Sequence, residues 1–305
     1  MKQHLFLALK IIISIASLVA LAYSVSWGAL LAVFRQIQLP WALLALAVFW
    51  AAQGISALRC AYIARRLGAY LDFGTSVRAH FLGLWFNQVL PTSLGGDVVK
   101  IAVLKKPLGL GIAVRATVLD RLSGLILLML AIALTLPLYA KLFNNTHMTL
   151  SLAALSMGFL LALPLGVWLA ASLQQRLPEQ AFLQKPLQLL ADLPRFRKGI
   201  PLWEQTWTST IVHFNGIAAY GLLGQALGIQ VDWLLFVLLV PLVFLVALIP
   251  LSFAGWGIRE AGAVWLFGIA GIAPEKALAM SVCFGLMLIV ASVPGLLLFM
   301  SNTEK

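Results

Sequence analysis

The sequence predicts an all-α integral membrane protein, a polytopic bundle of about seven or eight membrane helices in which one or two helices are broken or re-entrant. Of its 305 residues, 62% are hydrophobic and only 10% are charged, and apolar runs recur along the whole chain. About a quarter of the residues in a soluble domain are charged. Because no stretch is polar enough to fold as a separate soluble module, we expect residues 1–305 to form a single transmembrane domain.

Apolar runs of about 20 residues, the length that crosses a bilayer as a helix, define the expected spans. The first run, near 6–25, lacks the Ala-x-Ala cleavage pattern of a signal peptide and is predicted to be a membrane helix. Residues 28–38 are predicted to form a short amphipathic segment at the interface. The remaining regular spans are expected near 40–58, 118–140, 149–172, 206–227, 232–250 and 277–300.

The basic residues predict the topology of the chain. The net charge of +11 lies in loops between apolar runs, which favours topology signals and anionic-lipid contacts over nucleic-acid binding. Nine of the 21 Lys and Arg residues lie between residues 59 and 121, and five more lie between 176 and 198. Both regions are expected to be cytoplasmic, which places the N-terminus inside. Since both flanks of segment 76–106 are then cytoplasmic, this segment is predicted to be re-entrant.

A Pro-, Ser- and Gly-rich run interrupts that segment. Pro91 disfavours helix, and Thr92 or Ser93 can cap the helix that follows. Gly95 and Gly96 permit close backbone approach. The exposed N–H groups of a helix start favour an anion such as phosphate, and unwound backbone at membrane depth must be buried in protein or line a cavity.

A second interruption resembles the first. It starts at Pro250, and when the two runs are aligned on their prolines, Ser252 matches Ser93 and Gly255 matches Gly96. Paired Gly- and Pro-interrupted segments in two halves of a chain indicate an internal, inverted repeat with a transport site near the midplane.

Three of the ten acidic residues lie beside or inside apolar segments: Asp97, Asp120 and Glu260. Charges within membrane helices cost about 2.5 to 3.5 kcal/mol each, and this cost favours a functional role. The structural alternative is that Asp120 pairs with Arg115 or Arg121, and Glu260 with Arg259, simply to fix helix ends. The four His residues and the two Cys residues show no ligand spacing, and no Walker-type sequence is present, so we predict no metal site, no cofactor and no catalytic residue.

These motifs together resemble the lysylphosphatidylglycerol synthase transmembrane-region family, over nearly the whole chain. The resemblance rests on Asn87-Gln88-x-x-Pro91-x-Ser93-x-Gly95-Gly96-Asp97 with Lys100, on Asp120-Arg121-x-x-Gly124, and on Pro250-x-Ser252 with Gly255-x-Gly257-x-Arg259-Glu260. It implies a multi-pass, flippase-like protein of the inner (plasma) membrane, similar to the N-terminal half of multiple peptide resistance factors. That half moves aminoacylated phosphatidylglycerol between leaflets, whereas lysyl transfer belongs to a following soluble domain that is not expected in this sequence.

The resemblance implies binding and translocation of an anionic phospholipid or lipid-linked substrate, with a homo-oligomer as a further expectation. The implied substrate-binding residues are Asn87, Gln88, Ser93, Gly95, Gly96, Asp97, Lys100, Asp120, Arg121, Ser252, Gly255, Gly257, Arg259 and Glu260. Ser93, Gly95 and Gly96 would donate to a lipid phosphate, and Arg121 and Arg259 would supply positive charge.

Two other classes of protein remain open. A membrane transferase acting on a phospholipid or polyprenyl-phosphate could use the same Asp, Arg and Glu residues, although these carboxylates form no close acidic motif in the sequence. An accessory subunit that binds a lipid-modifying enzyme is the other alternative, and it would be favoured by tightly packed helix breaks without a cavity.

Overall fold

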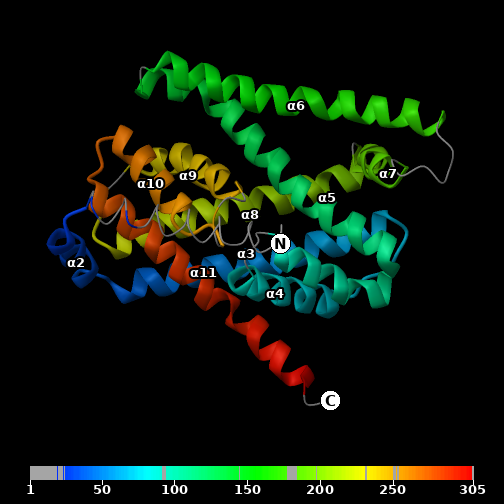
Figure 1. Ribbon diagram of the computed structural model, residues 1–305, viewed down its shortest axis with the longest axis horizontal. Coiled ribbons are helices and arrows are strands. Elements are labelled where there is room, and N and C mark those ends of the chain that lie inside the picture. Colours follow the sequence, from blue (N-terminus) through cyan, green and yellow to red (C-terminus); the bar gives the residue numbers. More distant parts are fainter. Residues whose placement is uncertain are drawn as a thin grey trace, which may run out of the picture. The chain divides into compact units, whose positions relative to one another are not determined.

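The computed structural model describes residues 19, 23, 25–90, 94–143, 145–176, 184–196, 198–230, 232–249, 252 and 254–303. In these ranges all regular structure is helical, as predicted, and no strand occurs (Figure 1). The helices are α2 (Trp27–Arg35), α3 (Leu39–Arg66), α4 (Phe73–Val89), α5 (Gly95–Phe143), α6 (Thr146–Gln174), α7 (Gln184–Asp192), the 3-10 helix η1 (Leu193–Phe196), α8 (Gly199–Ala226), α9 (Trp233–Ala247), α10 (Ile258–Ile269) and α11 (Pro274–Thr303).

Within the described residues, four helices are long and apolar enough to cross a membrane, namely α3, α5, α6 and α11. They contain the spans predicted near 40–58, 118–140, 149–172 and 277–300. The predictions near 206–227 and 232–250 correspond to α8 and to the shorter apolar helix α9. The helix predicted within 28–38 is present as α2, whereas the span predicted near 6–25 falls almost wholly outside the described residues. The protein is therefore an all-α polytopic membrane protein.

Both predicted interruptions are breaks between helices. Helix α4 ends at Val89 and α5 begins at Gly95, while α9 ends at Ala247 and α10 begins at Ile258. After the first break the chain stays helical through the basic region and into the next span, except for a kink at Gly109. Gly109 has φ 74° and ψ 155°, a conformation that is open to glycine because it lacks a Cβ.

The chain forms two compact units. Unit 1 contains the described residues of 1–54, 78–100 and 214–305, and unit 2 contains those of 55–77 and 101–213. In unit 1, α10 packs against both α9 and α11, and α2 also contacts α11 (Figure 1). The indole N–H of Trp50 on α3 donates to the carbonyl oxygen of Ala291 on α11, 3.0 Å away. Helix α11 thus contacts elements from both ends of the sequence.

Aromatic side chains fill the core of unit 1, and glycines on α8 make room for them. The rings of Tyr220 and Phe267 stack with centroids 5.9 Å apart, and Tyr220 also contacts Phe284 at 5.2 Å. A Cβ at Gly224 would lie 2.9 Å from the ring of Phe236. The small residues near 216–228 therefore serve helix packing, as their spacing predicts.

In unit 2, α6 runs back from the end of α5 and contacts α7 (Figure 1). Only Ser156 and Ala170 are buried on α6, so almost all of this apolar helix is left to contact lipid. A small apolar cluster of Ile63, Leu67, Ala116 and Leu119 joins the end of α3 to α5.

We expect Gly295→Ala to destabilise unit 1, because a Cβ there would lie 2.0 Å from the carbonyl oxygen of Phe81 on α4. Overpacking of this kind costs about 1 to 3 kcal/mol. The matched control is Gly54→Ala, a helical position with no atom within 4 Å of the added Cβ, which should be neutral or stabilising by up to about 1 kcal/mol. Thermal unfolding in detergent measures both. Equal midpoints for the two variants would contradict the packing of α4 on α11.

The start of α4 provides a pH-dependent contribution to stability. Hydrogen bonds from the hydroxyl and the amide of Thr75 lower the pKa of Asp72, which precedes the helix, below its model value of 3.8. A carboxylate with a lowered pKa stabilises the folded state above its unfolded pKa, and this stabilisation disappears as the pH falls through the folded-state pKa. Asp72→Ala should therefore lower the unfolding midpoint at pH 7, and the difference from wild type should shrink below about pH 4. A pH-independent difference would contradict this assignment.

Candidate functional site

The first helix break brings two backbones into direct contact. A Cβ at Gly96 would lie 2.0 Å from the carbonyl oxygen of Gly83, so α5 starts where it crosses α4. The N–H of Gly96 donates to the Oδ1 atom of Asn87 at 2.9 Å. This bond satisfies one of the orphan donors of the helix start. The predicted close backbone approach at Gly96 is confirmed, and its N–H already has a partner within the chain.

The charged residues of this break occupy the first turns of α5. Asp97 is half-buried in the first turn, where a negative charge interacts favourably with the helix dipole. Lys100 is buried, with 5% of its surface exposed. Gly95 is buried and Gln88 is half-buried. Pro91, Thr92 and Ser93 lie outside the described residues.

The second break contains three residues with left-handed backbone. Ala254 has φ 49°, Gly255 has φ 84° and Gly257 has φ 88°. The two glycines accept this region readily, whereas it costs an alanine roughly 1 kcal/mol or more. The loop therefore holds a strained residue immediately before α10.

A buried ion pair opens α10. The Nε and Nη2 atoms of Arg259 lie 2.9 Å and 2.5 Å from Oε1 of Glu260. The other carboxylate oxygen of Glu260 accepts the N–H of Gly257 at 2.7 Å, and Ser281 on α11 donates to Oε1 at 3.2 Å. Arg259 is 3% exposed and Glu260 is fully buried. The predicted Arg259–Glu260 pair is confirmed, and its carboxylate also caps the helix.

The guanidinium of Arg259 is enclosed by aromatic rings and a glycine. It lies 4.9 Å from the ring centroid of Trp256 and 6.0 Å from that of Phe284. A Cβ at Gly285 on α11 would lie 2.2 Å from Nη2 of Arg259. Trp256 thus covers the buried cation and stabilises it through a cation–π contact. Nearby in the sequence, Ser252 is buried, and its hydroxyl oxygen has no partner among the described residues.

The two breaks correspond by helix position rather than by distance from proline. Asp97 and Glu260 each occupy the third residue of the helix that follows the break. Gly96 is inside its helix, whereas Gly255, its partner when the prolines are aligned, precedes α10. The shared feature is therefore a carboxylate in the first helical turn, where it interacts with the free N–H groups.

A second buried ion pair lies in unit 2, and its partners differ from the expected ones. Asp120 pairs with Arg59 of α3, with 2.7 Å between Oδ1 and Nε, instead of with Arg115 or Arg121. Arg115 instead binds Asp192 at 2.8 Å. The sequence pairing is wrong because it considered neighbours on one helix, whereas Arg59 lies 61 residues earlier. Arg59 was missed as a site residue, since only its place among the apolar residues of α3 hints at a buried role. Arg121 is exposed.

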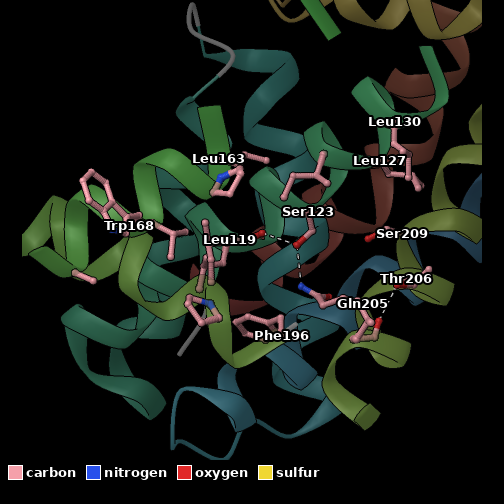
Figure 2. A pocket seen from close by; sticks show the side chains of 17 residues that line it. Leu119, Ser123, Leu127, Leu130, Leu163, Trp168, Phe196, Gln205, Thr206 and Ser209 are labelled. Atoms are coloured by element: carbon pink, nitrogen blue, oxygen red, sulfur yellow. Dashed lines mark hydrogen bonds between the residues drawn. The ribbon is translucent and has the colours of Figure 1, made fainter. Parts of the chain in front are cut away.

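A pocket of about 650 Å³ adjoins this ion pair in unit 2, between α5, α6, η1 and α8 (Figure 2). Its wall is mostly apolar and includes Leu127, Leu163, Trp168 and Phe196. Ser209, at its edge, accepts a hydrogen bond from Nη1 of Arg59 at 3.0 Å. The pocket is thus connected to the buried charges by a single side chain.

The pocket's other polar groups come from α5 and α8. Ser123 accepts a hydrogen bond from Nε2 of Gln205 at 2.8 Å and donates to the carbonyl oxygen of Leu119 at 2.7 Å (Figure 2). Thr206 donates to the carbonyl oxygen of Leu202 on its own helix. No sequence motif pointed to this pocket, although Asp120 and Arg121 lie between two of its lining residues on α5.

No three His, Cys, Asp or Glu side chains gather in a group suited to a metal ion in the part of the chain that the structure describes. The chemistry available at these sites is therefore recognition by hydrogen bonds, charge and apolar contact.

The fold and the exposed apolar helices define a multi-pass membrane protein associated with the lipid bilayer. The chain matches the family model of the lysylphosphatidylglycerol synthase TM region over residues 7–295, and it belongs to this family. No curated protein and no solved structure matches it.

We expect Glu260→Gln to lower the stability of unit 1 by about 3 kcal/mol or more, because it leaves the buried guanidinium of Arg259 without its counter-charge. The double variant Arg259→Met with Glu260→Gln removes both charges and should recover part of this loss. Unfolding midpoints of the two single variants and the double variant, measured in detergent, give the coupling energy. Additive effects of the single substitutions would contradict the pairing.

Proposed function

We propose that this protein binds a phospholipid or a lipid-linked substrate and moves it between the two leaflets of the membrane. The observation that carries the proposal is the apolar pocket of about 650 Å³ in unit 2, with its polar edge of Ser123, Gln205 and Ser209. Family membership supports a role in lipid modification or translocation.

The lining of the pocket suits a lipid. Its volume falls within the range of small-molecule sites, about 300 to 1,000 Å³. Apolar side chains such as Leu127 and Leu163 would contact acyl chain, and the polar edge would contact the headgroup or its ester linkage. Because Trp168 is 63% exposed on the little-buried helix α6, a lipid could enter from the side.

The adjacent ion pair supports a role beyond packing. Arg59 and Asp120 are 5% and 6% exposed, within long apolar helices. Buried charges in membrane helices are costly and are a functional hypothesis by default. Arg59 donates to Ser209 at the pocket edge, so a ligand that replaces this bond would disturb the pair. Arg121, exposed on the same turn of α5 as Asp120, would attract a lipid phosphate.

The broken helices of unit 1 supply the second part of the proposal. The unwound residues between α9 and α10 include a strained alanine and are held by one ion pair, so a small energy change would rearrange them. In this proposal Asn87, Asp97 and Lys100 at the first break, and Arg259 and Glu260 at the second, guide the headgroup during its passage. The remaining motif residues, Gln88, Ser93, Gly95, Gly96, Ser252, Gly255 and Gly257, shape the backbone around that path.

The distribution of basic residues supports a cytoplasmic N-terminus and an inner (plasma) membrane location. In this orientation the α6–α8 connection is cytoplasmic, so η1 lies at the cytoplasmic edge. A single transmembrane domain of residues 1–305 acting without a soluble module completes the proposal.

A second candidate function is that of an accessory subunit for a lipid-modifying enzyme. The tight packing at both breaks favours it, since Gly96 contacts Gly83 and Gly285 contacts Arg259 and Trp256. An accessory subunit would bind lipid without moving it unless its partner is present.

The test is translocation of labelled phosphatidylglycerol, phosphatidylcholine and polyprenyl-phosphate lipids by the purified protein in proteoliposomes. Val167→Trp, which fills the pocket, should slow the transfer of the transported lipid by about tenfold or more, which corresponds to 1.4 kcal/mol on the barrier. The matched control is Leu134→Trp, which adds the same ring at a residue of α5 that is 71% exposed and is not part of the pocket wall.

If wild type moves none of these lipids, the translocation proposal fails and the accessory function gains support. If it moves lipid and both tryptophan variants are equally active, the pocket is not on the path.

A further inference from the structure

One polar atom in the pocket of unit 2 lacks a partner. The side-chain oxygen of Gln205, Oε1, is buried and has no hydrogen-bond partner among the described residues. The residue lines the pocket (Figure 2). A buried acceptor without a donor costs about 1 to 3 kcal/mol, so its retention in an apolar wall points to a ligand that supplies the donor.

The hydrogen-bond network fixes which end of the Gln205 amide is unsatisfied. The hydroxyl of Ser123 has one proton, and it is donated to the carbonyl oxygen of Leu119 at 2.7 Å. Toward Gln205 the Ser123 oxygen can therefore act only as an acceptor, so the amide must present its NH₂ group, as it does at 2.8 Å. Rotating the amide would bring two acceptors together and is excluded. The carbonyl end of Gln205 thus faces away from Ser123.

The other polar groups of the pocket are already used. The hydroxyl of Thr206 donates to the carbonyl oxygen of Leu202 in its own helix. Ser209 accepts from Arg59, whose guanidinium also binds Asp120. These contacts satisfy the remaining edge internally, so the acceptor of Gln205 is where the pocket asks for a hydrogen-bond donor.

The charges around the pocket indicate the sign of the ligand. Arg121 lies between Leu119 and Ser123 in the sequence, and Arg195 lies between Pro194 and Phe196, and all four of these neighbours line the pocket. Arg121 is exposed, and the side chain of Arg195 is 51% exposed. The pocket edge thus carries positive charge that favours a phosphate diester over a cationic group.

We propose that this pocket binds an anionic phospholipid whose headgroup bears a free hydroxyl, and that this hydroxyl donates to Oε1 of Gln205. The acyl chain lies along the apolar wall of α5 and α6, and the phosphate lies toward the arginines. This proposal rests on the lipid-binding part of the proposed function and does not require translocation.

The test compares two lipids of equal charge that differ in the donor. Phosphatidylglycerol has a headgroup with free hydroxyls, and phosphatidylethanol is an anionic diester without one. Apparent dissociation constants for dioleoyl forms of both lipids, measured by native mass spectrometry on the purified full chain, should favour phosphatidylglycerol by about three- to tenfold, the value of one hydrogen bond.

Gln205→Leu should abolish this preference by removing the acceptor. The matched control is Thr206→Val, which removes a hydroxyl from the same wall whose proton is already donated within α8, and which should keep the preference. The wild-type comparison does not depend on the folding of any variant.

Equal affinities of wild type for the two lipids would overturn the proposal, as would a preference that persists in Gln205→Leu. Binding of phosphatidylglycerol no tighter than that of phosphatidylcholine would overturn its anionic part. A preference found together with absent translocation would refute the transport function while supporting this assignment of the pocket.

Discussion

The constraint on which unit 1 depends is the cost of burying a charge in an apolar helix bundle. Glu260 is fully buried, and it is tolerated because Arg259, Gly257 and Ser281 all donate to its carboxylate. This requirement explains the surrounding structure. The loop must turn through left-handed residues to direct the Gly257 N–H at the carboxylate, and α11 must have a glycine at 285 so that the guanidinium fits. The ion pair therefore fixes both the start of α10 and its contact with α11.

The same requirement acts in unit 2 with a different result. Asp120 is satisfied by Arg59, and Arg59 in turn donates to Ser209. This chain of bonds runs from the interior of the helices to the wall of the pocket, so the pocket has polar groups at one edge and apolar side chains elsewhere. A phospholipid has the same division between a polar headgroup and apolar chains, which is why we connect the pocket with lipid.

Glycine contributes to both breaks through close approach as well as through backbone freedom. Gly96 and Gly295 allow α5 and α11 to contact the backbone of α4, and larger residues there would separate the helices. In a membrane, helix association gains little from the hydrophobic effect, so close contact and hydrogen bonding supply the stability. Helix α4 is held in this way at two points, close to the interrupted backbone that the proposed function uses.

The sequence by itself determined the class of protein, most of the spans, both helix breaks and the Arg259–Glu260 pair. These features depend on local composition, on run length and on neighbouring residues, and the family motifs follow from the same stretches. Only the tertiary structure decided that Asp120 pairs with Arg59, that Asn87 satisfies the Gly96 N–H, and that Leu127, Leu163, Phe196 and Gln205 share a pocket. The reason is physical, because a buried charge or amide takes whichever partner the packing brings within about 3 Å, and that partner can be far away in the sequence.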